Sequence, residues 1–423
     1  MKTAGTQKRQ RFLMMLTGAF AIFFTGFPHV WSIYQPYVTE GTGWTQSQGA
    51  MCFYLALSAF VFGNILGGRM QNRFGPRKVL FLGGGLLSAG ILMSAFSLVS
   101  SPLPMYLTYG VMQGLGQGMM YTVILAAAQQ WFPDRTGFAS GIVVTANGLC
   151  VLFMAPFSRQ LLEKEGPKAT FLTVGILMAA AWILSSLFFA SPEENRETAK
   201  AGMGEAQSTC RQYTSGEMLR TKQFYFLLAT MLFGLISYFM ISPISQSYQL
   251  ELGIPAAAAV SSVMIGSVIN ALTRLVLPSL ADKVGRIVCV KGVLVIAAAA
   301  MILLCFSDSY GATIAMILIY GCYGGIMGSF PSLTSSVFGI RHAGENYGFV
   351  MLGIVIATFG TPVLTRMINV GENGMRYVFA AGAVFAAAAF VFIEMLRITL
   401  NKSDRSDDYG IDNNEKAASA GKK

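Results

Sequence analysis

A single arginine lies inside a long apolar stretch of this sequence. Between Ala256 and Leu280, Arg274 is the one charged residue. A charge at the centre of a bilayer costs about 2.5–3.5 kcal/mol on insertion scales, so it is retained where an anion, a cavity or a partner stabilises it. In a helix, Asn270 would lie one turn from Arg274 and add a hydrogen-bonding amide. The pair predicts a binding site for a carboxylate-sized anion.

A structural role, in which backbone carbonyls satisfy the guanidinium, is the alternative for Arg274. The acidic residues nearest to the apolar segments stand near the segment ends: Glu40, Glu251, Asp308 and Glu394. Because none of these is placed to pair with a cation at mid-bilayer, we expect an anionic substrate to be the counter-ion.

His29, which follows Pro28, is one of two histidines in the chain. Imidazole changes its charge near neutral pH, so His29 is the best candidate for a proton carrier in a substrate site. A histidine satisfied by its surroundings is an equal alternative. The sequence therefore leaves open whether a proton binds there as well.

The composition indicates a protein that lies mostly in lipid. The 423 residues are 54% hydrophobic and 12% charged, whereas soluble proteins are about 25% charged. About twelve apolar runs of roughly 20 residues are each long enough to cross a bilayer as a helix. Open sheets leave backbone groups unsatisfied in lipid. We therefore expect an all-α membrane protein with twelve transmembrane helices in two pseudo-symmetric six-helix bundles.

The net charge of +10 follows the expected topology and does not indicate a nucleic-acid partner. Most lysines and arginines fall in loops that share one side if the N-terminus is cytoplasmic, and this side is the cytoplasm by the positive-inside rule. We expect a multi-pass protein of the inner (plasma) membrane with both termini cytoplasmic and the lipid bilayer as its surroundings.

No signature of catalysis or of a cofactor is present. The six cysteines show no CxxC spacing and no histidine cluster accompanies them, so neither a metal site nor a disulfide framework is expected. The sequence contains no P-loop and no nucleophile elbow. We expect no enzymatic activity, no cofactor and no direct use of ATP.

A polar, charged stretch divides the chain into two halves. We expect an N-terminal bundle at 1–190, a cytoplasmic linker at 191–222, a C-terminal bundle at 223–398 and a polar cytoplasmic tail at 399–423. Two parallel six-helix repeats that face a site at the midplane are one architecture of secondary transporters.

A loop motif recurs in both halves at an offset of about 210 residues. Glycine permits a tight turn there, and the basic residues anchor the loop at the inner leaflet. The first copy contains Gly68, Asn72, Arg73, Gly75 and Arg77, and the second contains Asp282, Lys283, Gly285 and Arg286. Recurrence at matched spacing argues against an ordinary charged turn and predicts a structural or gating role.

The loop motif resembles that of the major facilitator superfamily, Gly-x3-Asp-Arg-x-Gly-Arg-Arg. Five further fragments, in order, are similar to the bacterial oxalate/formate antiporter family, which is related to the monocarboxylate transporters. They are Trp31-Ser32-Ile33-Tyr34, Gly43-Trp44-Thr45, Phe74-Gly75-Pro76-Arg77, Gly114-x-Gly116-x-Gly118-x2-Tyr121 and Trp131-Phe132-Pro133-Asp134-Arg135-x-Gly137-x-Ala139-x-Gly141.

This resemblance implies roles for several residues. Arg274 stands where an arginine of that family binds the substrate carboxylate, and Tyr121 matches a residue that lines the cavity. Other tyrosines fall on segments that line the cavity in the superfamily, although packing is the more common role of each: Tyr34, Tyr238, Tyr248, Tyr320 and Tyr323. The substrate-binding set expected here is Arg274, Asn270, Tyr121, Tyr34, His29 and Tyr320.

Departures from the family pattern bear on substrate charge. Oxalate carriers have a lysine after an Asn-Tyr-Gly start, whereas this chain has an uncharged residue near Ile354. Asn270 occupies the place of the aspartate of proton-coupled monocarboxylate carriers, so that proton-relay carboxylate is missing. Asn72 replaces the acid of the loop motif, which bears on the charge locking of that loop and not on the substrate. With one buried cation, a monoanion is neutralised better than a dianion.

The sequence thus predicts a secondary active transporter of small organic monocarboxylate anions, lactate- or formate-like, that works by alternating access. One alternative is a dicarboxylate antiporter of the oxalate/formate type. Another, from a different class, is a non-transporting membrane sensor on a transporter scaffold. Proton symport or anion exchange, the direction of transport and the oligomeric state are left open.

Overall fold

The computed structural model describes residues 4–189, 212–307, 310–371 and 373–420. Helices make up the fold of these residues, and they contain no strand. Two expected segments lie partly outside the described residues: the linker at 191–211, which contains Cys210, and the tail at 421–423. The described part of the expected tail continues the last helix, which ends at Ala420.

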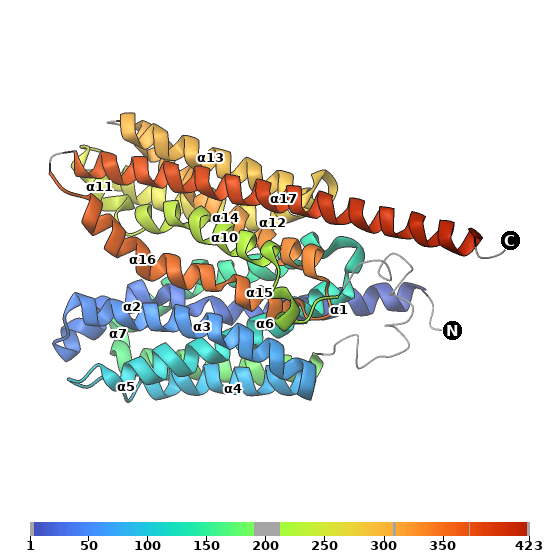
Figure 1. Ribbon diagram of the computed structural model, residues 1–423. Helices are drawn as coiled ribbons and strands as arrows, with labels where there is room; N and C mark the ends of the chain where they lie inside the picture. Colours follow the sequence, from blue (N-terminus) through green and yellow to red (C-terminus); the bar gives the residue numbers. More distant parts are fainter. Residues whose placement is uncertain (1–3, 190–211, 308–309, 372, 421–423) are drawn as a thin grey trace.

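The first half of the chain forms one helical bundle (Figure 1). Its elements are α1 (Ala4–Phe23), η1 (Phe24–Val30), α2 (Trp31–Thr42), α3 (Gln46–Phe74), α4 (Pro76–Ser94), α5 (Leu103–Met105), η2 (Tyr106–Gln113), α6 (Gly114–Trp131), η3 (Pro133–Arg135) and α7 (Thr136–Phe188). The short η1 segment is a 3-10 helix that contains Pro28, and η2 is a π-helix.

The second half forms another bundle beside the first (Figure 1). Its elements are α9 (Ser215–Met218), α10 (Lys222–Ile241), α11 (Ser245–Glu251), α12 (Ala256–Val284), α13 (Arg286–Phe306), α14 (Tyr310–Phe338), α15 (Ala343–Val350), α16 (Leu352–Ile368) and α17 (Gly374–Ala420). The beginning of α1 and the end of α17 lie at the same end of the molecule, which we call the terminal end. The opposite end is the far end.

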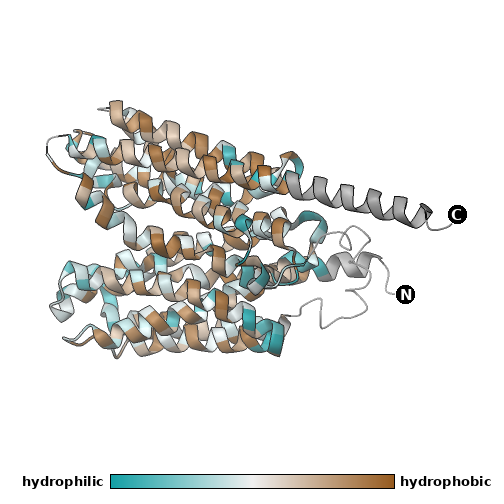
Figure 2. Ribbon diagram, in the orientation of Figure 1, coloured by the Kyte–Doolittle hydropathy of each residue, from teal (hydrophilic) through white to brown (hydrophobic). Residues whose placement is uncertain are grey.

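Ten helices in the described residues are long and apolar enough to cross a membrane. One of these candidate spans contains 55 residues, and Gly166 within it has non-helical backbone angles (φ 76°, ψ 174°) directly before Pro167. Large apolar side chains such as Phe306 (80% exposed) and Met367 (73% exposed) face outward. Figure 2 shows apolar residues along the outer helices and polar residues at both ends of the bundles. This distribution fits a protein surrounded by lipid.

The repeated loop motif makes the same tight connection in both halves. Gly75 separates α3 from α4 with φ 87°, and Gly285 separates α12 from α13 with φ 109°. Side chains rarely adopt these angles, so glycine is required for the next helix to start at once. Pro76 begins α4, where its missing N–H costs no hydrogen bond. These connections hold the motif's charged residues at the terminal end.

The first and the seventh apolar segments of the chain are both interrupted in the middle. Segment η1 breaks the helix between α1 and α2, and the turn at residues 242–244 separates α10 from α11. The backbone groups that such breaks release are tolerated at membrane depth where they line a cavity. Both breaks point to a site between the two bundles.

Candidate functional site

A cavity of about 710 Å³ lies between the two bundles. Both halves supply its walls, and most of the side chains are aromatic or polar. They include His29, Trp31, Ser32, Gln35, Phe53, Tyr54 and Gly148 from the first half, and Tyr238, Ser242, Asn270, Arg274, Tyr320, Tyr323 and Thr358 from the second. A ligand bound here would touch both bundles at once.

Arg274 is the cation of this cavity and is only 6% exposed. Its Nε donates a hydrogen bond of 2.9 Å to Oδ1 of Asn270, and its Cζ lies 5.3 Å from the centre of the Tyr323 ring. None of the ion pairs between described residues includes Arg274. A buried guanidinium with a neutral amide and an aromatic face can bind an anion through its remaining donors.

Close packing of α12 on α14 and α7 positions Arg274. A Cβ atom at Gly328 of α14 would lie 2.8 Å from the main-chain oxygen of Arg274, and one at Gly141 of α7 would lie 3.2 Å from it. The hydroxyl of Thr273 donates a 2.9 Å hydrogen bond to the carbonyl of Gly321 on α14. Glycine at these positions lets the backbones of α14 and α7 approach that of α12, which fixes the position of the Arg274 guanidinium in the cavity.

Tyrosines form one wall of the cavity beside Arg274. The rings of Tyr238 and Tyr323 stack with centroids 3.9 Å apart, and Tyr320 meets Tyr238 edge-on at 5.4 Å. A Cβ at Gly266 of α12 would touch the ring of Tyr320, so this wall also depends on close packing. The wall offers apolar faces and phenol hydroxyls to a ligand.

His29 lies in segment η1 and lines the same cavity as Arg274. Its ring is half-buried and meets the ring of Phe53 at 5.8 Å. Nearby, the Asn147 amide donates a 2.9 Å hydrogen bond to the Thr25 hydroxyl, which ties α7 to η1. The break around Pro28 thus brings the imidazole into the site.

Two of the six expected binding residues do not line the cavity. Tyr34 is buried in the first bundle, where its hydroxyl donates to Oγ of Ser158 at 3.0 Å and its ring packs on Phe171. Tyr121 is 2% exposed and packs edge-on against Phe60 at 5.2 Å. Its hydroxyl lies beside the hydroxyl of Tyr347 in α15. The structure brings together Arg274, Asn270, Tyr320 and His29.

Cavity residues that the sequence did not single out include Phe53, Tyr54, Gly148 and Thr358. An aromatic residue or a glycine in an apolar helix most often serves packing, so the sequence offers no signal that separates these residues from their neighbours. Only the side-by-side placement of the bundles reveals them.

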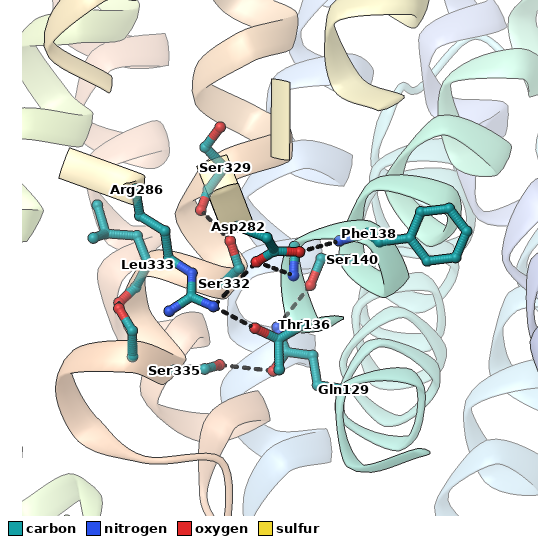
Figure 3. Close-up of polar contacts among 12 residues, drawn as sticks. Gln129, Thr136, Phe138, Ser140, Asp282, Arg286, Ser329, Ser332, Leu333 and Ser335 are labelled. Atoms are coloured by element: carbon teal, nitrogen blue, oxygen red, sulfur yellow. Dashed lines mark hydrogen bonds and ion pairs between the residues drawn. The ribbon is translucent and has the colours of Figure 1, made fainter. Parts of the chain in front are cut away.

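At the terminal end, Asp282 of the second half caps a helix of the first (Figure 3). Its Oδ1 and Oδ2 accept hydrogen bonds from the backbone N–H groups of Gly137 (3.1 Å) and Phe138 (3.0 Å) in the first turn of α7. Nη2 of Arg286 donates to Oδ1 of Asp282 at 3.1 Å and to the Thr136 hydroxyl at 2.9 Å. A carboxylate at a helix N-terminus satisfies free donors and complements the helix dipole.

Further polar contacts join the halves at this end. Nε of Arg69 pairs with Oε1 of Glu345 at 2.7 Å, and Asn72 forms a 3.1 Å hydrogen bond with Nδ1 of His342. A Cβ at Gly68 would collide with the backbone of Glu345, so Gly68 permits this approach. Deeper in the bundle, the Ser335 hydroxyl donates to Oε1 of Gln129 at 2.7 Å (Figure 3). Three other motif residues, Arg73, Arg77 and Lys283, are exposed.

The contacts between the two halves show which end of the molecule is closed. Within the described parts of the chain, the hydrogen bonds and ion pairs that join the halves all lie on the terminal side of Arg274. The cavity wall instead extends toward the far end, past Gln35, Pro243 and Pro362. Polar contacts thus close the terminal end, and the cavity extends from Arg274 toward the far end.

The family model of the major facilitator superfamily matches residues 14–362. The chain belongs to the major facilitator superfamily. The oxalate:formate antiporter of Oxalobacter formigenes is 28% identical over 406 residues, which cover 94% of each chain. The uncharacterised MFS-type transporter YhjX of Escherichia coli (strain K12) is 27% identical over 84% of this chain and 88% of its own. Human monocarboxylate transporter 11 is 27% identical over 54% of this chain and 47% of its own.

Solved structures of the superfamily share the fold. The proton:xylose symporter XylE aligns with a TM-score of 0.68 over 92% of this chain and 96% of its own, at 16% identity. FucP in its outward conformation aligns with a TM-score of 0.69 over 92% of this chain and 99% of its own, also at 16% identity. The chain is therefore a multi-pass membrane transporter by family and shares the fold of these structures, which confirms the resemblance seen in the loop motif.

Proposed function

We propose that this protein is a secondary active transporter that moves small organic monocarboxylate anions, lactate- or formate-sized, by alternating access. The observation that carries this proposal is Arg274, a buried cation that lines a cavity between the halves and pairs with no described carboxylate. Similarity to an oxalate:formate antiporter over 94% of both chains supports carboxylates as the substrate class.

The membrane topology is part of the proposal. The ten candidate spans become eleven if the break at Gly166 divides α7 into two spans, and twelve with the run Leu103–Trp131, whose π-helical segment interrupts it. Twelve spans place both termini on the same side, and we assign that side to the cytoplasm of the inner membrane. The structure then represents an outward-facing state. The bundles at 1–190 and 223–398 rock about the site to expose it on the other side.

In the outward-facing state, we assign substrate binding to Arg274, Asn270, Tyr320 and His29. The guanidinium binds the carboxylate, Asn270 orients it through the Nε hydrogen bond, and Tyr320 supplies part of the aromatic wall. Tyr121, which is buried against Phe60 while the terminal end is closed, joins the site when that end opens. Tyr34 serves packing, since its hydroxyl already bonds to another side chain of its own bundle.

The charge of the cavity supports a monoanion. Ile354, which stands near the position of the second cation in oxalate carriers, is buried in the apolar core of the second half. Arg274 is the one lysine or arginine among the described residues that line the cavity. Two carboxylates beside a single guanidinium would leave one negative charge unpaired at a cost of several kcal/mol.

One observation favours the second candidate, an oxalate/formate-type dicarboxylate antiporter. His29 lines the cavity together with Arg274, and a protonated imidazole would supply a second positive charge. A non-transporting sensor, the third candidate, has no observation in the described residues that favours it over transport. Oxalate affinity and its dependence on His29 separate the first two candidates.

Uptake of labelled lactate and formate into proteoliposomes tests the proposal. We expect saturable uptake by the wild type and loss of at least about 100-fold in Arg274→Gln, because removing a charged partner costs about 3 kcal/mol. Arg159→Gln removes an exposed arginine outside the cavity and should transport normally. Absence of uptake by the wild type, or saturable uptake unchanged in Arg274→Gln, would refute the proposal.

A further inference from the structure

The first half contributes a serine hydroxyl to the cavity that no other residue uses. Ser32 of α2 lines the cavity and is exposed. Its hydroxyl has no hydrogen-bond partner among the described residues. Ser32 belongs to the first half of the chain, whereas Arg274 belongs to the second. The two residues therefore offer polar groups to a ligand from opposite bundles.

The local backbone explains why the Ser32 hydroxyl is unpaired. A serine inside a helix commonly donates to the carbonyl four residues earlier, which for Ser32 is the carbonyl of Pro28. That carbonyl already accepts from the backbone N–H of Trp31 and, at 3.5 Å, from the hydroxyl of Tyr109. Because a carbonyl oxygen has two lone pairs, the Pro28 carbonyl has no acceptor position left for Ser32.

The neighbours of Ser32 hold α2 in place. The indole N–H of Trp31 donates to the carbonyl of Gly49 in α3 at 2.9 Å, and the hydroxyl of Tyr34 donates to Ser158 in α7 at 3.0 Å. These two side chains serve the packing of the first bundle on either side of α2. They leave Ser32 on the side of α2 that lines the cavity.

Ser32 lies near the part of the cavity wall that faces Arg274. His29 stands three residues before Ser32, so the two side chains lie on the same side of the chain, one turn apart. The charge of Arg274 acts on the imidazole of His29 across the cavity. Since α2 runs toward the far end, Ser32 lies on the far-end side of His29.

We infer that the Ser32 hydroxyl binds a second oxygen-bearing group of the substrate, so that the carrier prefers short hydroxy- and oxo-monocarboxylates to unsubstituted ones. This inference rests on the proposed function, in which Arg274 binds the carboxylate. A serine hydroxyl both donates and accepts, so it pairs with an alcohol or with a keto oxygen. Formate has no such group and is bound through its carboxylate alone. A substrate that contacts both bundles also favours their approach at the far end.

Lactate and propionate test this inference, because propionate differs from lactate only by the missing hydroxyl. Their inhibition constants are measured by competition against labelled formate in proteoliposomes. In Ser32→Ala, the ratio of the two constants should shift toward propionate by about two- to tenfold, the range for one neutral hydrogen bond. Ser32→Thr keeps the hydroxyl and should retain the preference of the wild type. Formate uptake shows that each variant is folded and active.

Ser267→Ala is the matched control, because Ser267 is a second exposed serine of the cavity wall. Its hydroxyl already donates to the carbonyl of Val263 at 2.9 Å, so its removal changes the cavity without removing an unpaired group. The lactate-to-propionate ratio should equal that of the wild type. An unchanged ratio in Ser32→Ala, or an equal shift in Ser267→Ala, would overturn the inference. Absence of uptake and of inhibition by any of these anions in the wild type would instead refute the proposed function.

Discussion

Neutralising Asp282 should open the terminal end of the transporter. In the closed state, the carboxylate accepts two backbone hydrogen bonds from the first turn of α7 and one from Arg286. The residue before this helix, Arg135, provides no side-chain cap, so Asp282 of the other half takes that role. Asp282→Asn keeps the size of the side chain and removes the charge and one acceptor oxygen.

The loss can be sized from these contacts. Hydrogen bonds to charged groups contribute about 1.5–3 kcal/mol each, and those between neutral groups contribute about 1 kcal/mol. The side chain of Asp282 is 13% exposed, so solvent screens these bonds little. Loss of one of the two backbone hydrogen bonds and weakening of the other should cost about 2–3 kcal/mol. The ratio of terminal-closed to terminal-open molecules should then fall by about 30- to 150-fold.

Spin-label distances measure this ratio directly. Labels at Arg77 and Arg220, both exposed at the terminal end on opposite halves, report its opening in a variant without native cysteines. Asp134→Asn is the control, because Asp134 stands just before α7 but forms its ion pair with Arg135 of its own half. A distance distribution unchanged in Asp282→Asn, or shifted equally in Asp134→Asn, would refute the assignment of this contact as a gate.

Four other outcomes follow from the site. Arg274→Lys should recover little of the transport lost in Arg274→Gln, because an ammonium lacks the planar fork that binds a carboxylate twice; normal uptake would contradict this. Calorimetry should show lactate or formate binding at least about tenfold tighter than oxalate. We expect either that uptake is insensitive to a pH gradient or that gradient-driven uptake is lost in His29→Ala. If an inward proton gradient accelerates uptake in both the wild type and His29→Ala, His29 is excluded as the proton carrier. Gly137→Ala should open the terminal end, because the added methyl group would collide with the carbonyl of Pro278. An unchanged distance between the spin labels in Gly137→Ala would contradict this prediction.

Local features of the site could be predicted from the sequence. A charged residue and an amide four positions apart in an apolar run must share a helix face, and the structure has the Nε of Arg274 bonded to Asn270 at 2.9 Å. The turn glycines could be predicted in the same way, because Gly75 and Gly285 recur before charged, basic helix starts in both halves. In each case the chemistry lies within a few residues of chain.

Features that depend on how the two bundles meet could not be predicted. Tyr34 and Tyr121 fall on helices next to the cavity, but helix rotation turns Tyr34 toward Ser158 and covers Tyr121 with Phe60. The pairing of Glu345 with Arg69 joins residues 276 positions apart, and neither residue shows its partner locally. A sequence pattern indicates which face of a helix is apolar. It does not indicate which polar groups of a distant helix will contact that helix.

The crossing of α7 and α12 links the binding site to the gate. Gly148 on α7 borders the guanidinium of Arg274 on α12, while the first turn of α7 binds Asp282 near the end of α12. Both contacts involve the same two helices, one from each half, about 12 Å apart along α12. An anion at Arg274 removes the cost of bringing the buried cation away from water, which favours closing the far end of the cavity. Rigid bundles that approach at the far end must separate at the terminal end, so substrate binding acts against the bonds of Asp282. The strength of those bonds therefore sets how much of the substrate's binding free energy is needed to reorient the carrier.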